Sequence, residues 1–162
     1  MNGGMGGGVL GRRHVLGFTL LEIMFAIVIV AALAAIAIPS YKNYIEKLKV
    51  NKAIAEIAEI SLAIERFHSV NLTYPTSLAQ LGISIPLDPW GNSYKYLAIA
   101  VSPPPNTGQV RRDRSLTPIN TDYDLYSMGK DGLTATQLNA PKAQDDVVRA
   151  SNGEFIGLAS DY

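Results

Sequence analysis

The sequence predicts an α+β fold in which one long N-terminal helix packs on a small antiparallel sheet. Residues 18–38 are almost entirely apolar, and residues 39–70 repeat apolar side chains every three or four positions. Residues 71–162 contain short apolar segments between loops rich in Pro and Gly. The first two patterns indicate a helix with a transmembrane half and an amphipathic half, and the third is typical of strands. We expect residues 39–70 and 71–162 to form the globular domain together.

The apolar run has the length of a membrane span. Its 21 residues, Phe18–Ile38, would extend roughly 31 Å as a helix, close to the hydrocarbon thickness of a bilayer. Arg12 and Arg13 precede it, and basic residues favour the cytoplasmic side of a span. We therefore expect a cytoplasmic N-terminus and an exported C-terminal domain.

Glu22 is the only charge in this run. A carboxylate near the centre of a membrane costs roughly 2.5–3.5 kcal/mol on insertion scales, so an ionisable residue there indicates a functional site that needs a partner. The obvious partner is the new amino terminus that cleavage after Gly17 would create at Phe18.

Pro39 ends the apolar run and predicts a kink or a locally melted turn, because proline removes a helical hydrogen bond. The helical pattern then resumes and continues to about Val70. Its apolar stripe, which needs a sheet to cover it, consists of Val50, Ala53, Ile54, Ile57, Ile60, Ile64 and Phe67.

The remaining region predicts a short helical turn and three strands. The turn is expected over residues 77–81, and the strands over residues 93–101, 123–128 and 154–158. Long loops separate them, among them residues 102–120 and 133–144.

Composition excludes several kinds of function. The chain has no cysteine, so neither a disulfide nor a thiolate site is possible. Its only histidines are His14 and His68, and no catalytic set emerges. The 14 basic and 14 acidic residues balance, which gives no argument for nucleic-acid binding. A local cluster, Arg111, Arg112 and Arg114, is interpreted as a solvated loop.

The stretch Gly17-Phe18-Thr19-Leu20-Leu21-Glu22 resembles the class III signal of type IV prepilins and type II secretion pseudopilins. The resemblance implies that residues 1–17 are a leader and that a prepilin peptidase cleaves after Gly17 and methylates Phe18. It implies a precursor in the inner membrane with its C-terminal domain in the periplasm. It further implies an inner-membrane assembly platform, and a helical homopolymer in which Glu22 meets the Phe18 amine of a neighbour.

Three further motifs resemble the major pseudopilin of type II secretion. They are Tyr74-Pro75-Thr76, Asp88-Pro89-Trp90-Gly91-Asn92, and Tyr123-Asp124-Leu125-Tyr126-Ser127 leading to Gly129-x-Asp131-Gly132. In that branch a calcium ion holds the C-terminal loop. The resemblance implies calcium ligands at Asp131, Asp145 and Asp146, although solvated loop aspartates are an alternative interpretation.

The chain departs from that branch in three places. Residues 133–144 replace an acidic glycine-rich loop, residues 102–120 form a longer loop, and residues 149–162 continue past the expected end.

Two functions remain open on the sequence alone. The first is a structural subunit of a type II secretion pseudopilus or a type IV-like pilus, which forms a periplasmic or extracellular filament. The second is an exported binding module held by an uncleaved signal anchor. Neither is an enzyme.

Overall fold

The computed structural model describes residues 17–114 and 116–162. This part contains the α-helix α1 (Leu20–Asn71) and the strands β1 (Lys95–Ala98), β2 (Tyr123–Ser127), β3 (Val147–Ala150) and β4 (Phe155–Leu158). Short 3-10 helices lie at Leu78–Leu81, Pro141–Ala143, Ser151–Gly153 and Ala159–Asp161. The α+β fold predicted from the sequence is confirmed. The leader residues 1–16 lie outside the described part.

The chain divides into two units, Met1–Lys42 and Asn43–Tyr162. Within the described part of the first unit, Thr19 caps the start of α1, because its hydroxyl oxygen accepts the backbone N–H of Glu22 at 3.2 Å. The helix continues through Pro39 without interruption, so the predicted melted turn is not observed. Proline removes one helical hydrogen bond, and next to it the Ser40 hydroxyl donates to the Ile36 carbonyl at 3.0 Å.

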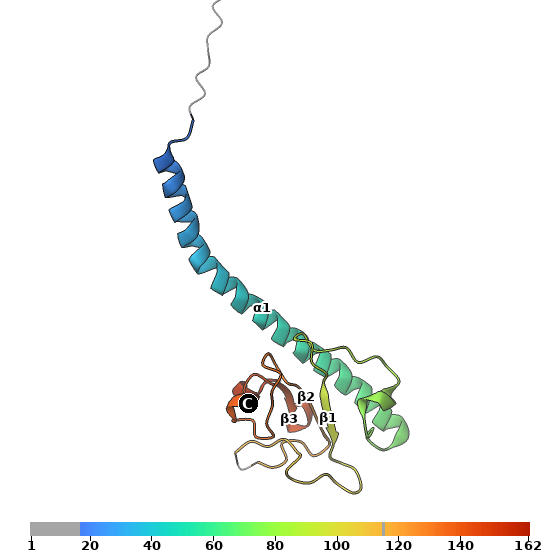
Figure 1. Cartoon of the computed structure of the whole chain (residues 1–162). Helices are drawn as coiled ribbons and strands as arrows, with labels where there is room; N and C mark the ends of the chain where they lie inside the picture. Colours follow the sequence, from blue (N-terminus) through green and yellow to red (C-terminus); the bar gives the residue numbers. More distant parts are fainter. Residues whose placement is uncertain (1–16, 115) are drawn as a thin grey trace, which may run out of the picture. The chain divides into compact units, whose positions relative to one another are not determined.

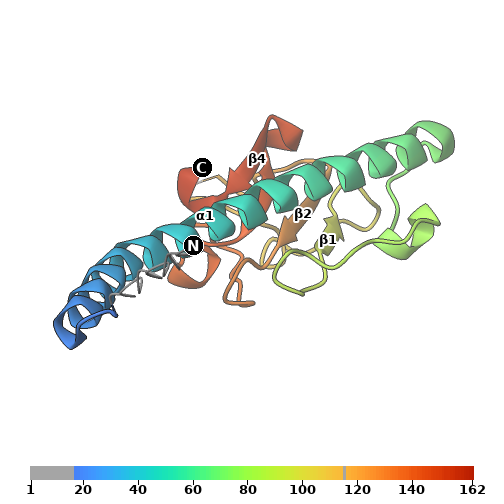
Figure 2. The ribbon, with the colours of Figure 1, turned by 90° about the horizontal axis from the view of Figure 1, so that it is seen from above.

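In the second unit, the rest of α1 lies along one face of the sheet (Figure 2). Ala53, Ile57, Ile60 and Ile64 are the buried residues of the helix, and they recur at the three- and four-residue spacing that the sequence predicted. They form one core with the buried sheet-side residues Tyr94, Tyr123, Leu125 and Val147. This contact between the helix and the sheet organises the unit.

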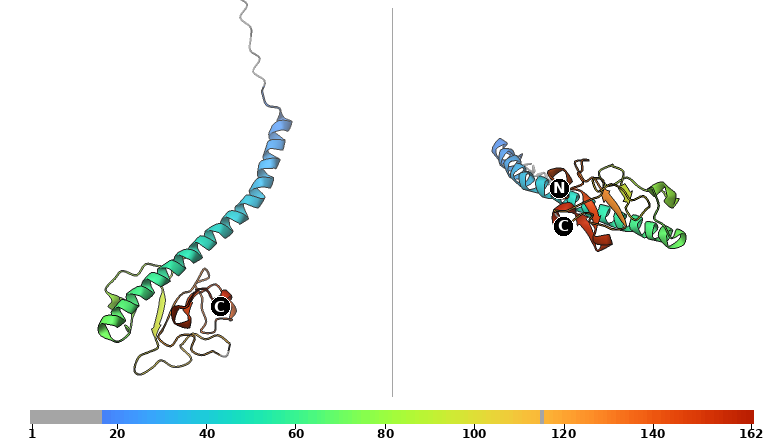
Figure 3. Two further views of the ribbon diagram at one scale, coloured as in Figure 1. Left: turned by 180° about the vertical axis from the view of Figure 1, so that it is seen from behind. Right: turned by 90° about the horizontal axis from the view of Figure 1, so that it is seen from below.

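The four strands form an antiparallel sheet in the order β1-β2-β3-β4. Figure 1 labels the first three of them. Residues 95–98 pair with residues 123–126, and β3 pairs with β4 along its whole length. Only Tyr126 and Ser127 of β2 pair with β3. Views from behind and from below show the sheet on one side of this segment of α1 (Figure 3).

A second core lies on the opposite face of the sheet. It comprises Ile119, Leu138, Val148, Ala150 and Ala159, with Tyr126 and Phe155 packed against it. Successive strand residues point to opposite faces, so Val147 faces the helix core while Val148 faces this second core. The unit therefore has three layers: a helix, a sheet and a layer of loops.

The predicted strands correspond to β1, β2 and β4, each within its predicted range. The strand β3 was not predicted. All four of its residues are buried, so it lacks the alternation of polar and apolar residues that reveals a half-exposed strand.

Candidate functional sites

The N-terminal end of α1 brings the predicted processing and assembly residues together. Gly17, Phe18 and Thr19 immediately precede the helix, and Glu22 lies in its first turn. Negative charge is favoured at this position, because the first N–H groups of a helix carry partial positive charge. The carboxylate of Glu22 thus has a local source of stabilisation, in addition to any amine that approaches it.

The apolar half of α1 has an exposed surface in the single chain. The helix is long and apolar enough to cross a membrane by length and composition, and none of the most apolar window is buried within the chain. The phenyl ring of Phe18 and the side chain of Leu20 are each about four-fifths exposed. Such a continuous apolar surface requires lipid or other protein around it.

Two of the three aspartates predicted to bind calcium lie together. The backbone N–H of Asp131 donates to Asp145 Oδ2 at 2.9 Å, and Asp131 Oδ1 accepts the N–H of Leu133 at 2.7 Å. Gly129 permits this close approach: it has a φ of +63°, and a Cβ there would overlap the carbonyl oxygen of Asp145. The Gly129–Asp131 turn and the chain at Asp145 are therefore held against each other by hydrogen bonds within the protein.

Asp146 has a different environment from Asp145. Its side chain is fully buried, and its Oδ2 lies 2.6 Å from the Arg111 guanidinium and 2.6 Å from the Thr134 hydroxyl. Burial raises the pKa of Asp146 to about 6, and the bonds from Thr134 and Arg111 oppose that shift. The carboxylate is therefore mainly ionised at neutral pH and can pair with the guanidinium.

In the described residues, Asp131, Asp145 and Asp146 are not grouped as three carboxylates. Within residues 17–114 and 116–162, no group of three or more His, Cys, Asp or Glu side chains could hold a metal ion. Asp131 and Asp145 form a pair, whereas Asp146 is bound by Arg111. Calcium binding by Asp131, Asp145 and Asp146 stays a prediction.

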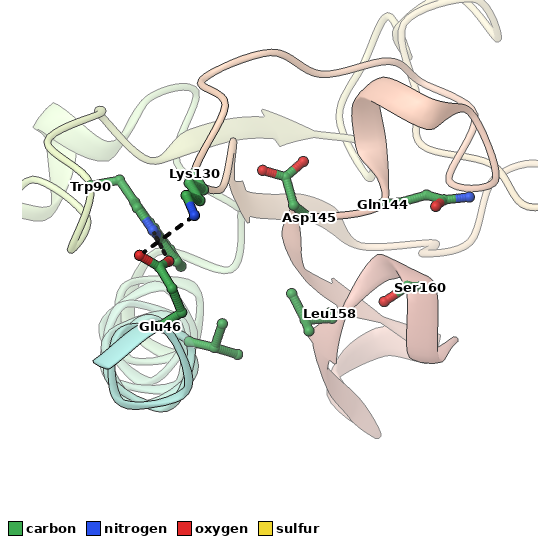
Figure 4. Close-up of a pocket in the computed structure, with 8 residues that line it drawn as sticks. Glu46, Trp90, Lys130, Gln144, Asp145, Leu158 and Ser160 are labelled. Carbon is green, nitrogen blue, oxygen red and sulfur yellow. Dashed lines mark hydrogen bonds and ion pairs between the residues drawn. The ribbon is translucent and has the colours of Figure 1, made fainter. Parts of the chain in front are cut away.

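A groove of about 430 Å³ lies beside this turn (Figure 4). Glu46 of α1 contributes one wall, where its Oε2 accepts the Trp90 indole N–H at 3.1 Å and its Oε1 lies 3.8 Å from Lys130 Nζ. Lys130 follows Gly129 directly, so Glu46 connects α1 to the turn that carries Asp131. Asp145 and Leu158 line the opposite side of the groove.

The interpretation of Arg111 as part of a solvated loop is wrong. Arg111 is only 2% exposed, and its guanidinium lies 4.1 Å from the ring centre of Tyr126. Arg114, in contrast, is exposed as expected. The cluster of arginines in the sequence could not show that Arg111 is buried and Arg114 exposed, because the carboxylate that pairs with Arg111 lies 35 residues further along the chain.

Arg149 forms a second buried ion pair. Its two terminal nitrogens donate to the two carboxylate oxygens of Asp122 at 2.9 and 2.6 Å, and its guanidinium lies 4.0 Å from the ring centre of Tyr123. Such a bidentate pair is geometrically specific. It anchors β3 to the residue that precedes β2.

The N-terminal features define a class of protein: a subunit with a prepilin-type signal and a single apolar anchoring helix. Consistent with this class, the family described as "Prokaryotic N-terminal methylation motif" matches residues 12–38. Matches over most of the chain identify the particular family. A "Type II secretion system core protein G" of Pseudomonas aeruginosa is 31% identical over 144 residues, covering 75% of this chain and 87% of the relative.

Proteins of the same name from two other organisms match the chain to a similar extent. The one from Escherichia coli is 30% identical and that from Aeromonas hydrophila is 29% identical, and they are covered over 86% and 90% of their lengths. The chain belongs to the type II secretion system core protein G family. No solved structure matches it.

Proposed function

We propose that this chain is a structural subunit of a type II secretion pseudopilus, which assembles through its N-terminal helix. The arrangement that carries the proposal is the one at the start of α1: a cleavable glycine, an exposed phenylalanine and a glutamate in the first helical turn, followed by an exposed apolar surface. Membership of the core protein G family supports a pseudopilus rather than a surface pilus.

The precursor is anchored in the inner membrane by residues 18–38. Arg12 and Arg13 keep its N-terminus in the cytoplasm, and the unit Asn43–Tyr162 is exported to the periplasm. A prepilin peptidase cleaves after Gly17 and methylates the amine of Phe18. An inner-membrane platform then moves the subunit from lipid into the growing filament.

Glu22 sets the register of that filament. An α-amino group has a pKa near 8, so the amine of Phe18 is mainly protonated at neutral pH. When it meets Glu22 of a neighbouring copy between apolar helices, the ion pair offsets the cost of burying both charges. A neighbour shifted along the axis leaves Glu22 buried without an amine, which is strongly unfavourable.

Mass spectrometry of the purified chain tests the processing on which this function depends. The expected mature N-terminus is N-methylphenylalanine at position 18. A chain isolated with residues 1–17 attached would instead support an exported binding module with an uncleaved anchor. Changing Gly17 to a larger residue provides the control, because it should retain the leader while leaving residues 18–38 in the membrane.

A further inference from the structure

Two segments by which this chain departs from the major pseudopilin pattern meet Asp146 at one buried side chain. Arg111 comes from the long loop of residues 102–120, Thr134 and Ala135 come from the segment that replaces the acidic loop, and Asp146 leads into β3. The side-chain atoms of Arg111 and Asp146 are 3% and 0% exposed. This convergence lies in the layer of loops, on the face of the sheet opposite to α1.

The two terminal nitrogens of the Arg111 guanidinium meet three oxygen atoms, while its buried Nε has no hydrogen-bond partner among the described residues. One terminal nitrogen donates to the Thr134 hydroxyl at 2.6 Å and to the Ala135 carbonyl at 2.8 Å, and the other donates to Asp146 Oδ2 at 2.6 Å. A carboxylate, a carbonyl and a hydroxyl are oxygen donors of the kind that hard cations take. Here a side chain of the protein supplies the positive charge.

The backbone at Arg111 is fixed to the sheet as well. Its N–H donates to Asp124 Oδ2 at 2.7 Å, and Asn120 donates to the other oxygen of the same carboxylate at 2.9 Å. Asp124 lies in β2, so the guanidinium is held at a defined distance from the sheet while it binds the two distant segments. Fixing both ends of the side chain reduces the entropy that each further hydrogen bond has to overcome.

We infer that Arg111 is an internal cation that closes the C-terminal loop of this subunit, so that closure does not depend on a bound metal ion. It joins residues 134–135 and Asp146 to β2, and this connection positions β3 for pairing with β2 and β4. The Asp131–Asp145 pair remains available for calcium, and the hydrogen bond from the Asp131 N–H to Asp145 also joins the two segments.

The test uses the full processed chain in detergent micelles, with and without a calcium chelator. Trp90 is the only tryptophan, so its fluorescence reports unfolding of the unit Asn43–Tyr162. Arg111→Met leaves Asp146 buried without its partner and should lower the midpoint of unfolding by about 10 °C or more. The chelator should move the wild-type midpoint by much less. Arg112→Met is the matched control, because Arg112 is only half-buried and its buried Nε has no hydrogen-bond partner among the described residues.

Local opening is measured at Lys142, an exposed residue between the two segments that Arg111 joins. A lysine-specific protease should cleave there at least about tenfold faster in Arg111→Met, because loss of the ion pair with Asp146 lowers the free energy needed to open the loop. If Arg111→Met does not fold, Arg111→Lys replaces it: lysine keeps the charge but not the fork that reaches three oxygens, so cleavage should be faster than in the wild type.

Two results would overturn the inference. One is cleavage at Lys142 that is no faster in Arg111→Met, or in Arg111→Lys where that variant is used, than in the wild type. The other is cleavage of the wild type that accelerates on chelation as much as it does in the variant, which would assign loop closure to calcium.

Discussion

At the scale of single residues, Glu22 illustrates how the sequence and the structure explain different parts of one feature. Its charge inside an apolar run predicts an ionic partner in another copy. The structure adds that Thr19 accepts the N–H of Glu22 at the start of α1, which is one half of a capping box. Thr19 and Glu22 are three residues apart in the sequence, which is the spacing of a capping box.

Gly129 gives a prediction at the same scale. Gly129→Ala should lower the free energy of unfolding by about 2 kcal/mol or more, because φ is +63° and the new Cβ overlaps the Asp145 carbonyl oxygen. Chemical denaturation followed by Trp90 fluorescence measures the change. Gly108→Ala is the control, since no atom lies within 4 Å of its added Cβ and its φ is not in the strained range. Equal stability of the two variants would contradict the close approach at Gly129.

At the scale of elements, periodicity in the sequence was a sufficient guide wherever one face of an element is buried. The helix α1 follows from such a pattern, and the strands β1, β2 and β4 follow from aromatic and apolar residues between turn signals, although four of the five residues of β2 are buried. The strand β3 does not, because Arg149 interrupts its apolar character while being buried itself by pairing with Asp122. The pairing of Arg111 with Asp146 was hidden for a related reason: buried ion pairs between distant segments leave no periodic signal.

The packing of α1 on the sheet gives a second prediction. Ile57 is fully buried in the core between helix and sheet, so Ile57→Ala should cost about 2–5 kcal/mol of unfolding free energy. Leu62→Ala on the same helix should cost much less, because its side chain is half exposed. Both values come from denaturation curves of the full chain in detergent. A larger loss for Leu62→Ala would mean that the buried face of α1 is misassigned.

At the scale of the whole molecule, the chain combines an anchoring helix, whose apolar surface is exposed, with a globular unit that carries its own two cores. The sequence predicted this division from the change in pattern near Pro39. It could not predict which interactions close the C-terminal loop, because they depend on where three loops meet in space. A buried arginine, Arg111, supplies a charge there in a chain that has no cysteine to form a disulfide.

Thr19 allows the two roles of Glu22 to be separated. Thr19→Val removes the oxygen that caps α1, which should cost about 1 kcal/mol of helix stability, but it leaves the Glu22 carboxylate in place. We therefore expect Thr19→Val to be processed and to assemble. Loss of assembly in Thr19→Val at normal protein levels would indicate that capping, rather than the charge of Glu22, is the requirement.

The most direct test of the account is the amount of chain recovered in sheared, sedimented filaments from cells that express wild-type protein or Glu22→Ala, with cleavage after Gly17 verified in both. The account predicts normal insertion and cleavage for Glu22→Ala, but a loss of most filament, because the Phe18 amine of each incoming subunit then lacks its carboxylate. Wild-type filament yield from Glu22→Ala would contradict the proposed role of the N-terminal helix.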